Sequence, residues 1–492
     1  MEISKENMKK NIRIYWPVLV LLLYIGVNTV LILNHENWRD EAQAWQIAKQ
    51  LNPAEIFAQL KYEGHPFLWY AILVPFAKLG LPFAGMGFVS LACMAAAAWL
   101  ILKKSPFPVP VRVLIVFSSF FVYYYPVVSR SYCLIPPILA WLAVLYPKRG
   151  EKPVHYGTAL ALLTQVHVFV VPLSLLLSVF WLAETFFEWR KEGAEGKEVF
   201  RKNLIGLGIS LASGLFLLWE LFGSEEANVQ VHVHLASSLN SNLHRINVGT
   251  QWGMNEMLGF SISDGDWRIF RVLILAGLFA FLFYAWKEAL IYAGFAATQF
   301  LMFTYVYLAS PQKAMILGHG LIFILWIIRE QREKRGWKDG CCLLVLLALL
   351  FVSTVHHRTK MEQDMTQAYS SSKSMAAYIE KHVPGDVPVA AAGDLFAEGT
   401  AAYLEREVWY PVTEEPVTFL VWDDRRRAGI RYEEMLERVR QKYPEAKEMY
   451  LICGDKEPGV YDWQDYIPQM EEKFCVNECI TDETASLYRV GL

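Results

Sequence analysis

The feature that most constrains this chain is a series of long apolar runs within its first 356 residues. Clear examples are residues 16–33, 83–102 and 204–222. A helix rises about 1.5 Å per residue and the hydrocarbon core of a membrane is about 30 Å thick, so runs of about 20 residues are long enough to cross it. The sequence therefore predicts a polytopic α-helical membrane protein rather than a water-soluble fold.

The apolar runs divide into about eleven predicted membrane-spanning helices. They are expected at residues 14–33, 83–102, 111–128, 132–146, 154–170, 171–188, 203–222, 269–286, 288–308, 314–329 and 341–356. Hydrophobic residues make up 54% of the chain and charged residues only 19%. This composition gives no indication of nucleic-acid binding.

The remaining residues, 357–492, have the composition of a small water-soluble domain. Residues 374–382 and 432–443 have helix-like patterns, and residues 387–392 and 448–453 have strand-like patterns. Alternation of helices and strands predicts an α/β domain. We therefore expect two domains, a membrane domain at 1–356 and an α/β domain at 357–492.

Lys and Arg are unevenly distributed among the predicted connections. One set holds about nineteen of them in about 54 positions, and the other holds about nine in about 106. Cytoplasmic connections carry the excess of positive charge, so the N-terminus is predicted inside the cell. The first apolar run is interpreted as an uncleaved helix, and an odd number of spans then places the C-terminal domain outside the cell membrane.

Two of the predicted outer loops are large, at about 34–82 and about 223–268. Residues 40–51 in the first loop have a helical apolar face. His65–Gly80 is apolar but short and contains two prolines, so it is predicted to lie at the membrane interface without crossing. The second loop carries His232, His234 and His244, and its pattern predicts no particular structure.

The most informative string is Trp38-Arg39-Asp40-Glu41, directly after the first predicted span. An acidic pair there lies close to the membrane surface, where a lipid-linked substrate presents its head group. The same residues also suit the start of a helix, since carboxylates in the first turn interact favourably with the helix dipole. The residue types alone leave both interpretations open.

This string resembles the GT-C superfamily of glycosyltransferases that use polyprenyl-phosphate sugars. The nearest likeness is to the bacterial relatives of protein O-mannosyltransferases and to lipid A aminoarabinose transferases. In that superfamily an Asp-Glu pair also follows the first transmembrane helix. His65-Pro66 resembles the family's His-Pro-Pro segment, although Phe67 replaces the second proline.

Three further segments resemble the superfamily in position. Ser129-Arg130-Ser131-Tyr132 resembles its second outer loop, and His167 and His319 lie where relatives place polar residues that face the catalytic cavity. A soluble outer domain at the C-terminus is also usual in these proteins. The resemblance covers most of the chain in layout and about 20 residues in motif.

The resemblance implies an integral membrane glycosyltransferase that moves a sugar to a hydroxyl acceptor outside the membrane. Asp40 would be the base that deprotonates the acceptor, and Glu41 would position the acceptor or hold Asp40. A leaving lipid phosphate needs a cationic partner, for which Arg130 is the first candidate. The other predicted substrate-binding residues are Arg39, His65, Tyr132, His167, Lys313 and His319.

Several of these residues have ordinary alternatives. Lys313 and Arg130 could anchor helix ends at lipid head groups, and His167 and His319 could be satisfied core residues. Asp264 and Asp266 suit a turn better than a metal site. In the α/β domain, Asp394, Asp423 and Asp424 are further acids to consider; Asp394 follows a predicted strand, as ligand-binding carboxylates often do, but suits a surface turn better.

The implied partners are a polyprenyl-phosphate sugar, with undecaprenyl phosphate as the expected carrier, and a protein, lipid or glycan acceptor. No cofactor is predicted and no metal ligand is assigned, although some GT-C enzymes depend on a divalent ion. Two other functions stay open. A transporter or flippase of lipid-linked sugars would need polar residues near the middle of the bilayer, and a membrane scaffold would leave the Asp40-Glu41 pair with a capping role alone.

Overall fold

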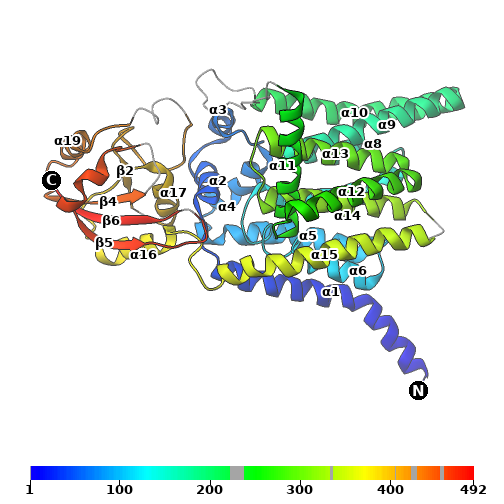
Figure 1. The fold of residues 1–492 in the computed structure, drawn as a ribbon, viewed down its shortest axis with the longest axis horizontal. Coiled ribbons are helices and arrows are strands. Elements are labelled where there is room, and N and C mark those ends of the chain that lie inside the picture. The colour runs from blue at the N-terminus through cyan, green and yellow to red at the C-terminus, as the bar shows by residue number, and fades with distance from the viewer. Residues whose placement is uncertain are drawn as a thin grey trace.

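The computed structural model describes residues 2–221, 238–332, 336–404, 406–422, 429–454, 459–481 and 483–492. It consists of a helical bundle with a smaller α/β domain at one end (Figure 1). The N-terminus lies at the opposite end of the bundle. His232, His234, Asp423 and Asp424 lie outside the described residues.

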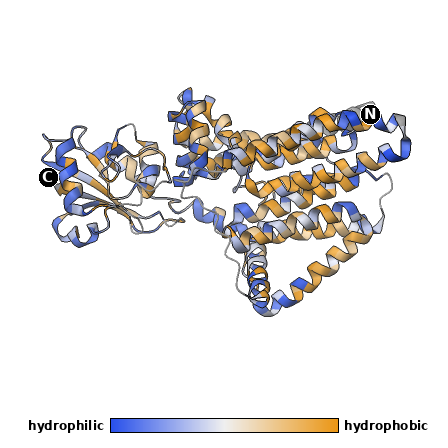
Figure 2. Cartoon of the chain, turned by 90° about the horizontal axis from the view of Figure 1, so that it is seen from above, coloured by the Kyte–Doolittle hydropathy of each residue, from blue (hydrophilic) through white to orange (hydrophobic). Residues whose placement is uncertain are grey.

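Seven helices of the described part are long and apolar enough to cross a membrane. They lie in α1 (Glu2–Asn34), α5 (Met86–Lys104), α9 (Val171–Glu192), α10 (Ala194–Leu221), α12 (Asp264–Tyr284), α14 (Pro311–Glu330) and α15 (Trp337–Asp364). Figure 2 shows apolar residues along nearly the whole length of the bundle helices. This arrangement confirms a multi-pass membrane protein.

The other four predicted spans correspond to shorter or more polar helices. They are α6 (Val109–Val116), α7 (Ile135–Leu145), α8 (Pro153–Thr164) and α13 (Trp286–Tyr305). Helix α13 has a spanning length of 20 residues, but it buries Glu288 and Gln299. Helices α6, α7 and α8 have only 8, 11 and 12 residues.

The prediction of one continuous helix over residues 111–128 was wrong. Helix α6 ends at Val116, and the chain continues as buried, non-helical backbone up to Arg130. Such backbone is tolerated at membrane depth only where other parts of the protein satisfy its polar groups. Here Tyr24 Oη donates to the Phe121 carbonyl at 2.7 Å, and Ser119 N donates to Thr354 Oγ1 at 3.0 Å. We call residues 117–130 the buried loop.

The chain between α1 and α5 forms a helical layer at the bundle end that faces the α/β domain (Figure 1). It contains α2 (Arg39–Gln50), α3 (Pro53–Glu63) and α4 (Leu68–Lys78). The predicted helix at 40–51 is thus confirmed. Helix α4 has 11 residues, about 16 Å in length, which is too short to cross a membrane, as predicted for His65–Gly80.

The second predicted loop contains a helix that its pattern did not indicate. Helix α11 (Leu239–Leu258) includes His244 and runs across the ends of the bundle helices (Figure 1). Gly249 and Gly253 lie against Thr304 and Phe303 of α13, where an added Cβ atom would overlap both neighbours. These glycines let α11 pack closely on the bundle despite its many Asn and Ser residues.

The C-terminal domain is α/β, as predicted. Its helices are α16 (Ser372–His382), α17 (Asp394–Tyr403) and α19 (Tyr432–Lys442), and its strands are β1 (Val389–Ala391), β2 (Val408–Tyr410), β3 (Glu415–Pro416), β4 (Glu448–Gly454), β5 (Glu471–Val476) and β6 (Ala485–Gly491). The strand order is β3-β2-β1-β4-β6-β5. Strand β1 pairs in parallel with β2 and β4, and the other pairs are antiparallel. Helix α15 continues to Asp364, beyond the boundary predicted at residue 356.

Candidate active site

Asp40 and Glu41 lie in the first turn of α2 but point into different surroundings. The side chain of Asp40 is 36% exposed, whereas Glu41 is fully buried. Glu41 Oε2 accepts a hydrogen bond from the backbone nitrogen of Trp38 at 3.1 Å, which satisfies one of the free N–H groups at the helix start. Glu41 therefore caps the helix, and Asp40 is the carboxylate that a substrate can reach.

Glu41 also joins the start of α2 to three other parts of the chain. Its Oε1 accepts from the backbone nitrogen of Ser129 in the buried loop at 2.7 Å. Its Oε2 lies 3.1 Å from His35 Nε2, and His35 Nδ1 lies 2.8 Å from Asp364 Oδ2 at the end of α15. This buried network fixes the buried loop and α15 relative to Asp40.

His35 is the cation of that network. Burial by itself would lower the pKa of His35, but the charge of Glu41 and the hydrogen bond to Asp364 outweigh burial and raise the pKa to about 10. The imidazole is therefore protonated at neutral pH. One imidazolium then lies between two buried carboxylates, an arrangement in which every charge has a hydrogen-bonded partner.

Arg130 is paired directly with Asp40. Arg130 Nη1 donates to Asp40 Oδ2, and the Arg130 side chain is 18% exposed. On the other side, Arg39 Nε lies 3.8 Å from Asp40 Oδ1. The backbone bond from Ser129 to Glu41 positions Arg130 for this pairing, because the two residues are adjacent in the chain.

Aromatic rings and histidines surround Arg130. Its guanidinium lies over the ring of Tyr132 at 6.0 Å, and Tyr132 stacks on His167 with ring centroids 4.7 Å apart. The His167 ring lies 5.2 Å from that of His65. Within the described residues, no hydrogen-bond partner lies at His65 Nδ1 or His167 Nε2, although both atoms are buried. Two buried ring nitrogens are thus available to a ligand.

His65 is neutral at physiological pH. Burial lowers the pKa of His65 to about 4, and the nearby charges of Arg130 and Lys313 act in the same direction. A neutral imidazole carries one N–H donor and one acceptor nitrogen. His65 can therefore offer a hydrogen bond to a ligand without adding charge.

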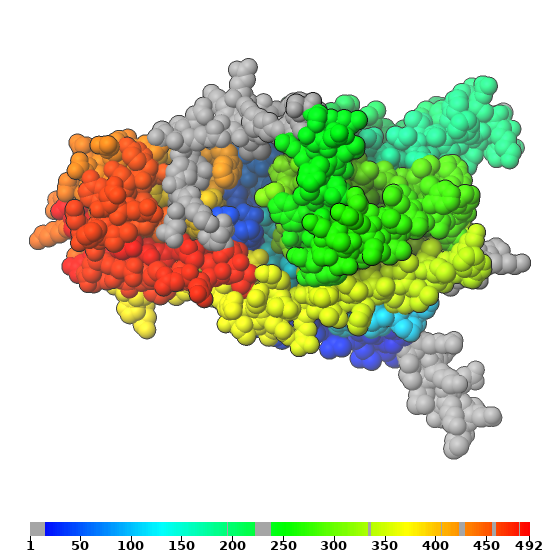
Figure 3. All heavy atoms as spheres, in the orientation of Figure 1, coloured from blue at the N-terminus to red at the C-terminus, as the bar shows by residue number. Residues whose placement is uncertain are grey.

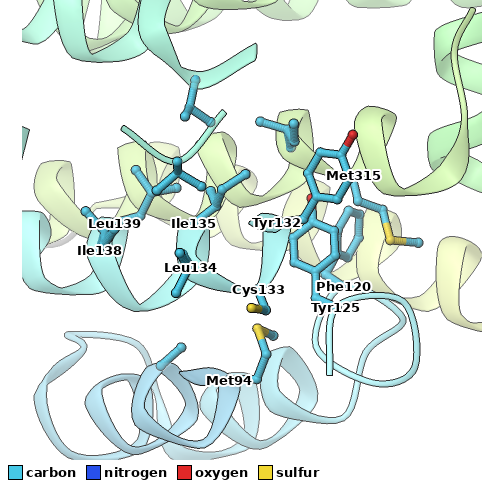
Figure 4. Packing of buried hydrophobic residues seen from close by; sticks show 14 of the residues in the cluster. Met94, Phe120, Tyr125, Tyr132, Cys133, Leu134, Ile135, Ile138, Leu139 and Met315 are labelled. Carbon is cyan, nitrogen blue, oxygen red and sulfur yellow. The ribbon is translucent and has the colours of Figure 1, made fainter. Parts of the chain in front are cut away.

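Lys313 belongs to the same region, and His319 lies deeper. Lys313 Nζ donates to the Leu308 carbonyl at 3.2 Å and lies 5.3 Å from the centroid of the Tyr307 ring. His319 is buried and stacks on Tyr125 at 4.9 Å, and Tyr125 in turn stacks on Tyr132 at 5.8 Å. Figure 4 shows Tyr125 and Tyr132 gathered with Phe120 beside Met315. Stacked rings thus connect His167, Tyr132, Tyr125 and His319.

The two glycines next to His319 in the chain explain why His319 is buried. Gly318 and Gly320 precede and follow it on α14, and an added Cβ atom would overlap Phe120 at Gly318 and Phe295 at Gly320. The two glycines let these rings approach the helix. His319 therefore lies buried among the rings of Phe120, Phe121 and Tyr125.

Glu63 is a buried acid of this region that the sequence pattern did not single out. Its Oε1 accepts from Gln43 Nε2 at 2.6 Å and from Gln59 Nε2 at 2.8 Å. Burial raises the pKa of Glu63 to about 7, although hydrogen bonds and the charge of Arg130 oppose the rise. A carboxyl with a pKa near neutrality, close to Arg130, is typical of functional sites. Its position next to the Gly64-His65-Pro66 segment was the available signal.

Other candidate residues have structural surroundings. Asp264 and Asp266 lie in the first turn of α12, where Ser263 caps the helix by accepting from Asp266 N at 3.2 Å. Asp394 is buried in the first turn of α17, so the prediction of a surface turn was wrong. Among the described residues, no group of three or more His, Cys, Asp or Glu side chains is arranged to hold a metal ion.

A cavity of the helical bundle lies away from Asp40. It is a lateral groove of about 940 Å³ lined by apolar residues of α12, α13, α14 and α15. No residue of α2 or of the buried loop contributes to its lining. The groove is therefore a feature of the membrane part and separate from the Asp40 region.

No protein-family model and no curated protein matches this sequence. The overall fold, a helical membrane bundle followed by a small α/β domain, is similar to that of solved ArnT structures. One solved structure that this chain resembles in fold is ArnT from Cupriavidus metallidurans bound to undecaprenyl phosphate, with a TM-score of 0.53 and 12% sequence identity. The similarity covers 96% of this chain and 98% of that chain. The apo structure of the same ArnT covers 95% of this chain and 97% of that chain, with a TM-score of 0.48 and 11% identity.

Proposed function

We propose that this chain is an integral membrane glycosyltransferase that moves a sugar from a polyprenyl-phosphate carrier to a hydroxyl acceptor. The observation that carries the proposal is the pairing of a partly exposed carboxylate, Asp40, with the guanidinium of Arg130 at the end of a membrane bundle. The fold likeness to ArnT, which was solved with undecaprenyl phosphate bound, supports the same carrier here. The acceptor class, whether protein, lipid or glycan, stays open.

In this reaction Asp40 accepts the proton of the acceptor hydroxyl while the hydroxyl oxygen attacks the anomeric carbon of the sugar. The bond between that carbon and the phosphate oxygen breaks, and the lipid phosphate leaves with the bonding electrons. One carboxylate at hydrogen-bond reach is sufficient as the base of such a displacement. Its expected contribution is about 10²–10⁴-fold in rate.

The leaving phosphate meets a set of donors in the same region. Arg130 can bind phosphate oxygens through two N–H groups, and Lys313 adds a second positive charge. The unpartnered nitrogens of His65 and His167 offer neutral hydrogen bonds. When the phosphate draws the Arg130 guanidinium toward itself, Asp40 Oδ2 becomes available to the acceptor hydroxyl. Donor binding would thus prepare the base.

The test is sugar transfer by purified protein in lipid, supplied with a panel of radiolabelled polyprenyl-phosphate sugars and crude envelope acceptor. The wild type should transfer at least one sugar, and Asp40→Asn should lose about 10²-fold or more of that rate. Asp264→Asn is the matched control, because Asp264 is also an acid in the first turn of a helix but accepts a hydrogen bond from Gln251 and not from Arg130. It should leave transfer unchanged.

Two results would count against the proposal. Transfer that survives Asp40→Asn removes Asp40 from the role of base. If the wild type transfers no sugar from any donor, a flipping assay with the same lipids distinguishes the transporter alternative from the scaffold.

We also propose that the N-terminus is cytoplasmic and that the α/β domain faces the outside. Lys103 and Lys104 end α5, and Arg190 and Lys191 end α9, all at the bundle end away from that domain. Basic residues gather on the cytoplasmic side of membrane proteins. Labelling of a single cysteine at Glu448 in intact cells by a membrane-impermeant maleimide should succeed, whereas a cysteine at Lys191 should react only after lysis. The reverse pattern would invert the topology.

A further inference from the structure

We propose that the C-terminal α/β domain is a positioning element of the active site, and that Glu483 holds Asp40 in place through Arg39. The inference rests on the proposed role of Asp40. It assigns the domain a part in the reaction without requiring that the domain bind the acceptor. Figure 3 shows atoms of the N-terminal part, in blue, lying between this domain and the rest of the bundle.

Glu483 contacts the residue that directly precedes the proposed base. The carboxylate of Glu483 is only 1% exposed. Its Oε1 accepts from the Arg39 backbone nitrogen at 3.2 Å and lies 3.4 Å from Arg39 Nε. One buried carboxylate thus fixes both the backbone and the side chain of Arg39. Because Arg39 is adjacent to Asp40, this contact sets where the first turn of α2 begins.

The same domain holds the chain on both sides of Arg39. Tyr403 Oη accepts from the Asn37 backbone nitrogen at 2.8 Å. Leu420 N donates to Gln43 Oε1 at 2.7 Å, and Gln43 Nε2 donates back to the Leu420 carbonyl at 2.9 Å. The segment that contains Asp40 is therefore bonded to the α/β domain on both sides of the base, at Asn37 and Arg39 before it and at Gln43 after it.

Close packing supports these bonds. Helix α17 lies directly on the start of α2, where an added Cβ atom at Gly399 would be 3.7 Å from the Arg39 backbone nitrogen and would overlap Ser372. The guanidinium of Arg39 also lies 5.8 Å from the centroid of the Phe396 ring on α17. The α/β domain therefore contacts the start of α2 through close packing as well as through hydrogen bonds.

Such positioning matters because a base must stay at hydrogen-bond distance from the proton that it removes. A displacement of about 1 Å by a remote substitution can lower a rate by about 10²-fold. Loss of Glu483 should therefore lower kcat while the KM for the donor stays nearly constant, since Arg130 and Lys313 remain. Glu483 does not touch the reacting atoms and acts through Arg39.

The experiment uses the full-length protein in lipid with Glu483→Ala, Glu483→Gln and Tyr403→Phe. Amide hydrogen exchange of the peptide that contains Asn37 and Arg39 should become faster in Glu483→Ala and Tyr403→Phe than in the wild type. Glu483→Gln keeps an oxygen acceptor for the Arg39 N–H and should be intermediate. Glu448→Ala is the control, because it removes an ion pair with Arg489 within the same domain and should leave this exchange unchanged.

Activity supplies the second measurement. Glu483→Ala should lower kcat by about 10–100-fold with little change in KM, and Arg39→Ala combined with it should cost no more than Glu483→Ala alone. Unchanged exchange near Asn37 and Arg39 in Glu483→Ala would overturn the inference, as would additive losses in the double variant. Exchange does not depend on catalysis, so the exchange result stands even if the proposed transferase activity fails.

Discussion

His35→Gln removes the imidazolium that joins two buried carboxylates, Glu41 and Asp364. A rise of the His35 pKa from 6.5 to about 10 corresponds to roughly 5 kcal/mol of preferential stabilisation of the protonated ring, at about 1.4 kcal/mol per pKa unit. Breaking a buried charge pair by removing one partner costs about 3–5 kcal/mol. We therefore expect the variant to lose about 4 kcal/mol of stability at neutral pH.

The loss of stability in His35→Gln should depend on pH. Because the pKa of His35 is higher in the folded protein than in the unfolded chain, its contribution is fully present below pH 6.5 and is lost as the pH rises through about 10. The measurement is the Tm of wild type and His35→Gln in the same lipid between pH 6.5 and 10.5. We expect a difference of roughly 5 °C at pH 6.5 that shrinks toward pH 10.5. A difference that is absent, or constant over this range, would refute a protonated His35 in the network.

Three further substitutions test other parts of the structure. Gly318→Ala should lower stability by about 1–3 kcal/mol, measured as a fall in Tm, because the new methyl group overlaps the Phe120 ring; an unchanged Tm would contradict this packing. Arg130→Lys keeps the charge but loses the planar pair of donors, so the transfer assay should give a kcat/KM for the donor about 10-fold lower, and full activity would exclude a geometric role for the guanidinium. Asp339→Ala leaves Arg329 buried without its carboxylate partner and should cost about 3–5 kcal/mol by thermal unfolding, whereas a loss under about 1 kcal/mol would mean that the pair is solvated.

Much of the fold follows from apolar length alone. An apolar run such as residues 83–102 is long enough to span a membrane as a helix, and few other folds would bury it. The α/β domain was predicted from the alternation of helix-like and strand-like patterns. The buried loop could not be predicted, because residues 117–130 have the composition of a span. Their non-helical path depends on side chains far away in the sequence, such as Tyr24 and Thr354, that satisfy the backbone.

The sequence predicted the acidic pair of the candidate site, but it did not predict the residues that hold this pair in position. Asp40 and Glu41 lie shortly after the first predicted span and Arg130 after the third, and the family resemblance draws attention to both positions. The division of roles between an exposed Asp40 and a buried Glu41 required the structure, since two adjacent acids look alike in a sequence. Glu483 lies more than 400 positions from Arg39, and no periodicity connects them.

The length of helix α15 bears on the depth at which the reaction would occur. It has 28 residues and is therefore about 42 Å long, whereas the hydrocarbon layer is about 30 Å thick. Its last residue, Asp364, contacts His35 beside the Asp40 turn. Because the hydrocarbon layer can hold only part of this length, we expect that turn to lie outside it, in the layer of phosphates, ions and bound water. An acceptor molecule would therefore reach Asp40 laterally through the head-group layer or from the aqueous phase. Its polar groups would not need to enter the hydrocarbon core.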